Sequence, residues 1–161
     1  RFSTVYGSTA DHPDRVIPAF CRAAIRGEPL RVEGRATCLD ITHVDDVAAG
    51  ITAVAAILGR GGCLPPMHLV SGRGIALASL ARLVVRLAGS ASPIVVAPAR
   101  TYDVSRFIGD PALAGSRIGW RATIGPEQGV AGLIAGLRGG PAAPVRAVAG
   151  PASCGAVRVA G

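Results

Sequence analysis

Arg100 and Asp103 are the residues of this chain best suited to bind a charged ligand. They flank a turn that follows the apolar segment Ile94-Val95-Val96, which is expected to form a strand. A guanidinium at such a place can bind a phosphate through two parallel N–H donors, and the carboxylate can orient it or accept a sugar hydroxyl. The same pair can instead form an ion pair on the surface. The spacing alone favours the ion pair, so the anion site is kept as the alternative.

A second polar group consists of His43, Asp45 and Asp46. Such residues can act as acid and base or bind a metal. The spacing, however, places His43 at the end of a strand and both acids in the first turn of a helix, where they favour the helix dipole and cap free N–H groups. The remaining histidines, His12 and His68, have no matching spacing, and the four cysteines form no Cys-x-x-Cys. We therefore expect capping and packing roles here, and no metal site.

The segment Ser71-Gly72-Arg73-Gly74 follows an expected strand and precedes an expected helix, as a dinucleotide-binding loop does. The third glycine of G-x-G-x-x-G is replaced by Leu77, and no acid lies about 20 residues further on. The pattern favours a strand-to-helix turn without a cofactor role.

These residues are positioned by an alternation of expected strands and helices. Period-two and buried apolar segments predict strands over 2–6, 30–33, 38–42, 67–70 and 94–96. Helical spacing predicts helices over 16–26, 44–58, 77–87, 111–118 and 126–137. The single tryptophan, Trp120, is expected to anchor the last two helices. The class is therefore α/β or α+β, with an organised region over 1–137 and a disordered tail over 138–161, which is rich in Gly, Ala and Pro.

The composition excludes several functions. The 161 residues are 50% hydrophobic with a mean hydropathy of +0.44, which suits one folded domain. All 17 basic residues are arginine, so the chain holds no Schiff-base lysine, Walker-A lysine or Tyr-x-x-x-Lys pair. The net charge is +7, but the arginines are dispersed and aromatic residues are few, so we expect no nucleic-acid binding.

The sequence also indicates where the chain is found. No uncharged run reaches the roughly 20 residues of a membrane span, and no leader peptide is visible, so we expect no membrane association. The four cysteines are expected to be free thiols, which predicts a reducing compartment, the cytoplasm. The chain begins with Arg1, which indicates a piece of something longer.

Several segments in the correct order resemble the C-terminal part of the NAD-dependent epimerase/dehydratase family, the extended short-chain dehydrogenases that act on nucleotide sugars. Arg1–Gly7 resembles the family's R-[FY]-x-N-V-Y-G strand, and the segment 40–48 resembles D-F-x-x-V-D-D-V-A. The further matches cover 15–20, 26–30, 68–74, 100–104, 110–114, 118–120 and 126–129. No single motif decides the matter, but together they cover about residues 1–137.

This resemblance implies a fold: the last elements of a Rossmann-type domain plus the small C-terminal α/β domain that closes over the substrate. It implies a parent enzyme that uses NAD or NADP to act on a nucleotide sugar, with the main cofactor loop and the catalytic Tyr/Lys pair in a missing N-terminal Rossmann half. A homodimer is compatible with it. The chain is then a substrate-binding portion that is inactive alone. The alternative is a free-standing, non-catalytic module that binds a sugar nucleotide or another subunit.

The resemblance also assigns roles to individual residues. Phe2 and Ser3 match positions on the nicotinamide side of the site, and Thr4 matches an asparagine that contacts the substrate near its diphosphate. The matches to substrate-contacting positions are Arg15 and Val16, which precede a helix, and the phosphate-binding Arg100 with its neighbour Asp103.

Two departures from the family pattern bear on the ligand. The turn from Gly34 to Asp40 is one residue shorter than in the family, and Leu39 stands where a second phosphate-binding arginine is usual. The loss of one cation implies a weaker grip on a nucleotide diphosphate or a different sugar carrier. Without the remaining sheet, the edge of the strand at 2–6 is expected to be exposed, so we predict a marginally stable chain that aggregates.

Overall fold

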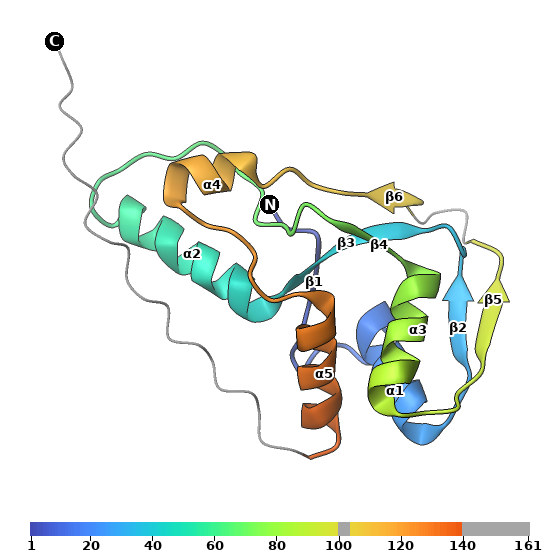
Figure 1. Cartoon of the computed structure of the whole chain (residues 1–161). Helices are drawn as coiled ribbons and strands as arrows, with labels where there is room; N and C mark the ends of the chain where they lie inside the picture. The colour runs from blue at the N-terminus through green and yellow to red at the C-terminus, as the bar shows by residue number, and fades with distance from the viewer. Residues whose placement is uncertain (100–103, 140–161) are drawn as a thin grey trace, which may run out of the picture.

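The computed structural model describes residues 1–99 and 104–139, which form five helices and six strands (Figure 1). One sheet joins β1 (Thr4–Tyr6), β3 (Cys38–His43) and β4 (Gly74–Ala76), and β6 (Arg106–Phe107) also pairs with β3. A second, two-stranded parallel sheet joins β2 (Leu30–Glu33) to β5 (Ile94–Ala97). The strand β3 is shared: its last three residues pair in parallel with β1, and its first three pair antiparallel with β4.

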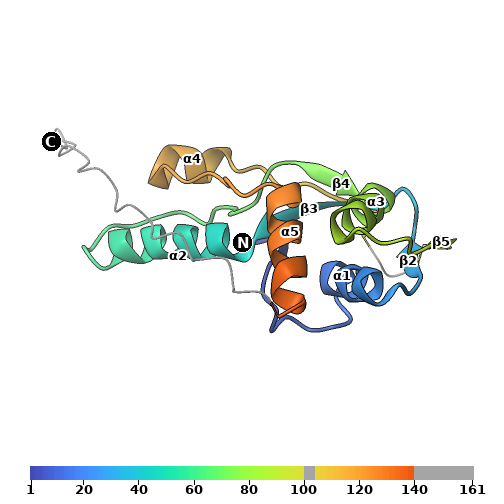
Figure 2. The same cartoon turned by 60° about the horizontal axis from the view of Figure 1, so that its bottom comes forward.

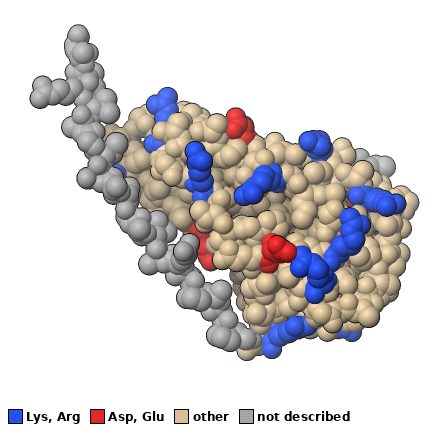
Figure 3. Space-filling view, in the orientation of Figure 1, with Lys and Arg blue, Asp and Glu red and all other residues tan. Residues whose placement is uncertain are grey.

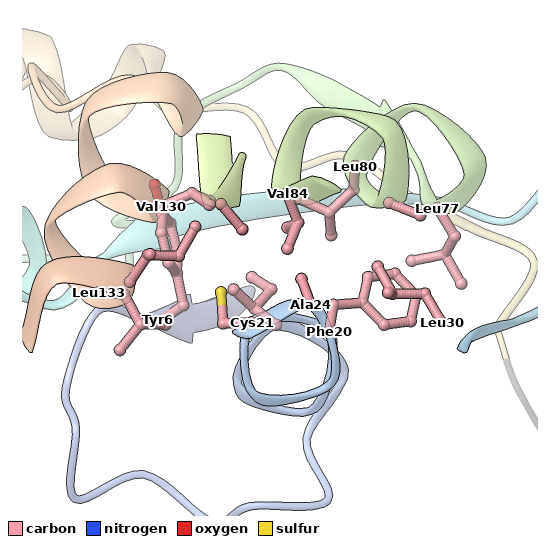
Figure 4. Packing of buried hydrophobic residues seen from close by; sticks show 14 of the residues in the cluster. Tyr6, Phe20, Cys21, Ala24, Leu30, Leu77, Leu80, Val84, Val130 and Leu133 are labelled. Carbon is pink, nitrogen blue, oxygen red and sulfur yellow. The ribbon is translucent and has the colours of Figure 1, made fainter. Parts of the chain in front are cut away.

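Three helices pack around the main core. They are α1 (Val16–Arg26), α3 (Leu77–Ala88) and α5 (Pro126–Leu137). Figure 4 shows their apolar side chains pointing toward one another, with Cys21 and Ala24 as the small residues in the middle. Small side chains at these places let the helices approach closely. The fully buried members of this core include Ile17, Cys21, Leu30, Val32, Leu80, Val84 and Val130.

A smaller core lies at the other end of the molecule, between α2 (Val44–Leu58) and α4 (Ala112–Ile118). In both Figure 1 and Figure 2, α2 and α4 lie on one side of β3, and α1, α3, β2 and β5 lie on the other. Trp120 is buried here, and its Nε1 donates to the carbonyl of Asp46 at 2.7 Å. It therefore fixes α4 to α2 rather than to α5, which differs from the expected link between the last two helices.

The predicted elements are largely confirmed, and their ends follow from local chemistry. The helix α1 ends at Gly27, whose φ of 73° is left-handed and favours glycine. The helix α5 begins with Pro126, which has no N–H to satisfy at the first turn. Among the described residues no helix is long and apolar enough to cross a membrane.

The segment 67–70 differs from the predicted strand. It makes only an isolated parallel bridge between Phe2 and Leu69. The next backbone N–H groups, those of Ser71 and Gly72, donate to the carboxylate of Asp40 instead of to a neighbouring strand. The ladder therefore ends after one pair, and the chain turns into β4, a strand that the sequence pattern did not indicate.

Candidate substrate-binding site

A cleft of about 460 Å³ lies between α1, α3 and the start of β3. Its apolar walls are Val16 and Phe20 of α1, Leu39 of β3 and Leu77 of α3. Its polar lining residues include the buried Thr37 and, nearer to solvent, Asp14, Arg31 and Glu33. Apolar walls with a few polar groups at the mouth are typical of small-molecule sites.

Side chains alternate between the two faces of β2, and this places Arg31 and Glu33 at the cleft. Leu30 and Val32 are fully buried in the core, so Arg31 and Glu33 point the other way. Nε of Arg31 lies 3.1 Å from Oε1 of Glu33, and the Arg31 side chain is 72% exposed. The exposed Arg31 guanidinium can therefore bind an anionic ligand at the mouth of the cleft while its Nε stays paired with Glu33.

A tight turn at Gly34 shapes the wall between β2 and β3. Gly34 has a φ of 76°, and a Cβ there would lie 2.4 Å from Oγ1 of Thr37 and 3.0 Å from Cβ of Ala99. Only glycine fits such a place without strain. The turn brings Ala99 against this wall, and Val104 lines the cleft. Arg100 and Asp103 come between these two in the sequence and lie outside the described residues.

The structure places Val16 and Thr4 on the same side of the main sheet. Val16 lines the cleft directly. Thr4 is half-buried and lies opposite Ile41 in the parallel register. Because side chains alternate along a strand, Thr4, Ile41 and Leu39 share one face. Thr4 thus faces the cleft side, although it does not line the cleft.

Arg15 points elsewhere. Its guanidinium lies 3.5 Å from Asp11 and lines a separate hollow of about 180 Å³ beside Tyr6 and Val44. Val16 and Arg15 are therefore neighbours in sequence that face two different hollows, because Arg15 is the extended residue that precedes α1.

Phe2 and Ser3, the residues matched to the nicotinamide side, lie immediately before the first residue of β1. The Ser3 hydroxyl is 3.4 Å from Oδ1 of Asp40 and 3.4 Å from the Thr42 hydroxyl. Phe2 is half exposed and lines an apolar hollow of about 340 Å³ together with Ile51, Leu58, Leu64 and Met67.

The Ser71–Gly74 loop does not fit a dinucleotide phosphate. Asp40 is fully buried, and its carboxylate accepts the Ser71 N–H at 3.0 Å, the Ser71 hydroxyl at 2.7 Å and the Gly72 N–H at 2.9 Å. A phosphate would need these same N–H groups. The turn binds the Asp40 carboxylate and leads into β4, not directly into a helix as the sequence pattern predicted.

His43 has the capping role that its spacing predicted. Its Nδ1 accepts the N–H of Asp45 at the start of α2, and its ring contacts Tyr6 edge-on. Burial, with a smaller effect of the Asp46 carboxylate, raises the pKa of Tyr6, so this tyrosine stays neutral. Among residues 1–99 and 104–139 no group of three His, Cys, Asp or Glu side chains could hold a metal ion.

Sequence reasoning missed the role of Asp46. Its carboxylate accepts the Thr123 N–H at 3.1 Å, the Thr123 hydroxyl at 2.9 Å and the Ile124 N–H at 2.9 Å. It therefore fixes a segment more than 70 residues away rather than capping only its own helix. No local pattern marks such a partner.

Comparison with solved structures gives many matches to sugar-nucleotide enzymes. One is MoeE5 in complex with UDP-glucose and NAD, with 31% identity and a TM-score of 0.76 over 86% of this chain and 46% of that one. Others are TunA, an NAD-dependent NDP-hexosamine 5,6-dehydratase (27% identity, TM-score 0.75), and the UDP-glucose 4-epimerase of Thermus thermophilus (25%, 0.76). Each of these two covers 86% of this chain and 45% of its own. No family model and no curated protein matches the chain.

These matches show that the chain is a mixed α/β protein with the fold of the short-chain dehydrogenases. More narrowly, the chain belongs to the NAD-dependent epimerase/dehydratase family of extended short-chain dehydrogenases. It spans less than half the length of the structures that it matches, which is consistent with a C-terminal portion of the family's fold.

Proposed function

We propose that this chain is the substrate-binding portion of an NAD(P)-dependent nucleotide-sugar epimerase or dehydratase, and that the cleft beside Val16 receives the nucleotide sugar. The observation that carries this proposal is the place of Val16. Its position matches a substrate contact of the family, and its side chain lines a cleft with apolar walls and Arg31 at the mouth. MoeE5, which matches the chain, was solved in complex with UDP-glucose and NAD.

The proposed roles follow from the chemistry of each residue. Val16, Phe20 and Leu77 contact the apolar faces of the nucleoside. Arg31 attracts the diphosphate, and Arg100 provides the bidentate phosphate contact with Asp103 beside it. Thr4 offers a hydroxyl toward the substrate from the same face of the sheet.

The cofactor and the catalytic groups belong, in this proposal, to a Rossmann half that packs on the other face. The whole sequence has no lysine, so it cannot supply a Tyr-x-x-x-Lys pair, and the chain is expected to be inactive alone. The apolar hollow around Phe2, Ile51 and Leu58 is where that half would cover exposed side chains, with Phe2 and Ser3 at the boundary. Assembly as a homodimer and residence in the cytoplasm belong to the same proposal.

The binding test is a calorimetric titration of the 161-residue chain with UDP-glucose. We expect a dissociation constant of about 0.1–1 mM, because one half of the fold covers only part of the ligand. Val16→Trp fills the cleft and should abolish binding, whereas Val95→Trp, at an exposed strand position outside the cleft, should not. Equal effects of the two variants, or undetectable binding by the unaltered chain, would contradict the cleft assignment.

A second test separates a portion of an enzyme from an independent module. The nucleotide sequence upstream of the Arg1 codon, read in frame, should encode a G-x-x-G-x-x-G loop and a Tyr-x-x-x-Lys pair. A stop codon or an independent start there would favour the non-catalytic module instead.

A further inference from the structure

A second hollow of about 540 Å³ shares no lining residue with the cleft. The loop after Leu69 forms one wall with Ser71 and Arg73, and α4 with the turn that follows it forms the other with Ser116 and Arg121. Arg73 and Arg121 thus line one cavity, and none of its lining residues within 1–99 and 104–139 is acidic. Two positive charges that face a common space repel each other unless an anion lies between them.

No acidic side chain in the described part of the chain forms an ion pair with either arginine. Elsewhere on the surface, Arg26 pairs with Glu28, Arg31 with Glu33, and Arg86 with Glu127. Arg73 and Arg121, by contrast, have no ion pair with any residue that the structure describes. Figure 3 shows the same imbalance on one face of the molecule, where arginines are numerous and acidic side chains few.

Both arginines stand on backbone that a buried carboxylate fixes. Asp40 holds Ser71 and Gly72, and the N–H of Arg73 itself donates to the Ser71 hydroxyl at 3.1 Å. On the opposite wall, Arg121 lies between Trp120 and Thr123, which are tied to the carbonyl and the carboxylate of Asp46. Backbone that is already fixed need not be ordered when a ligand binds, so only the two arginine side chains lose freedom.

We propose that this hollow binds the phosphate of a small phosphorylated molecule, at a site separate from the nucleotide-sugar cleft. Two guanidinium groups can each present parallel N–H donors to phosphate oxygens. The volume of about 540 Å³ lies within the roughly 300–1,000 Å³ of small-molecule sites, which suits a phosphate with an attached organic group. The proposal does not depend on the function of the cleft.

The test is a titration of the full chain with pyrophosphate, followed by amide chemical shifts in ¹⁵N-labelled protein. We expect saturable shifts in Ser71–Arg73 and around Arg121. Arg73→Gln and Arg121→Gln should each weaken binding about fivefold or more, and Arg73→Lys, which keeps the charge but not the fork of donors, should weaken it less.

Two variants with the same loss of charge serve as controls. Arg117→Gln removes a charge from α4 outside the hollow, and Arg60→Gln removes an exposed charge after α2 that lines neither the hollow nor the cleft. Both should change pyrophosphate affinity less than twofold. Equal weakening by all four glutamine variants would show unspecific attraction to a basic protein, saturable shifts confined to the cleft beside Val16 would place the anion there, and unsaturable shifts would show no site. Each of these results overturns the proposal. The fluorescence of Trp120 and the UDP-glucose affinity report whether the variants keep their fold and their cleft.

Discussion

Replacing Asp40 should destabilise the fold far more than replacing a partly exposed carboxylate such as Asp45. Asp40 is fully buried, and it accepts three hydrogen bonds of 3.0 Å or less from Ser71 and Gly72. The Gly109 N–H adds a longer one at 3.3 Å. A hydrogen bond to a charged group contributes about 1.5–3 kcal/mol, and a buried donor left without a partner costs about 1–3 kcal/mol. Because such losses are not additive, we expect Asp40→Ala to cost about 3–5 kcal/mol.

Asp40→Asn tests the same reasoning with little change of shape. An asparagine keeps one acceptor oxygen for Ser71, but its NH₂ group then faces the Gly72 N–H, so donor meets donor. We expect a loss of about 2–3 kcal/mol for this variant. Asp45→Ala is the control, since its carboxylate is partly exposed and lies 3.6 Å from Nδ1 of His43. It should cost less than about 1 kcal/mol.

The assay is urea unfolding at about 1 µM protein, a concentration that limits aggregation. The single tryptophan, Trp120, is buried and reports the transition. With a urea dependence of about 1–3 kcal/mol per molar, the Asp40→Ala midpoint should fall by about 2 M. A cost within about 1 kcal/mol of that of Asp45→Ala would refute the view that the buried carboxylate organises this loop.

Three further outcomes are expected. Gly34→Ala should lower the free energy of unfolding by about 1–2 kcal/mol, because Gly34 has a left-handed φ and an added Cβ would meet the Thr37 side chain. The same change should weaken UDP-glucose binding. Urea unfolding measures the first effect, and calorimetry measures the second. Burial raises the pKa of the Cys21 thiol to about 12, so with rising pH the unfolded chain loses the thiol proton at a lower pH than the folded chain does. The free energy of unfolding should therefore fall between about pH 9 and 12. Urea unfolding of Cys21→Ala over the same pH range should show a smaller fall. Ile51→Gln should reduce light scattering by the isolated chain, because this half-exposed side chain lies in the apolar hollow beside Phe2; unchanged scattering would place the aggregating surface elsewhere.

The local parts of the fold were predictable because local chemistry determines them. Apolar spacing and Gly27 define α1, and Pro126 marks the start of α5. His43 could be assigned to the strand-to-helix junction because the acids that follow it favour a helix N-terminus. Val16 is proposed as a substrate contact only through the family resemblance, since a valine at the start of a helix carries no chemical signal of its own.

What the sequence did not predict depends on contacts between distant residues. β4 and β6 are short and exist because β3 offers them its first residues. The segment 67–70 has the composition of a strand, yet its ladder ends where Asp40 takes the next N–H groups. Hydrophobic periodicity describes which face of an element is buried, and it does not describe where that element's hydrogen bonds go.

Asp40 and Asp46 show why a buried acid requires a different interpretation from an exposed one. In the sequence, Asp46 is an acid in the first turn of an expected helix and capping explains it adequately, whereas Asp40 lies in an expected strand and has no assigned role. In the structure each is at most 5% exposed and binds N–H groups of a segment 31 to 78 residues away. Because an unpaired buried charge is costly, such a carboxylate must collect donors from wherever the fold brings them. The same two residues hold the walls of the hollow between Arg73 and Arg121, so a loss of pyrophosphate affinity in Asp40→Asn, with Arg73 intact, would link the buried network to that site.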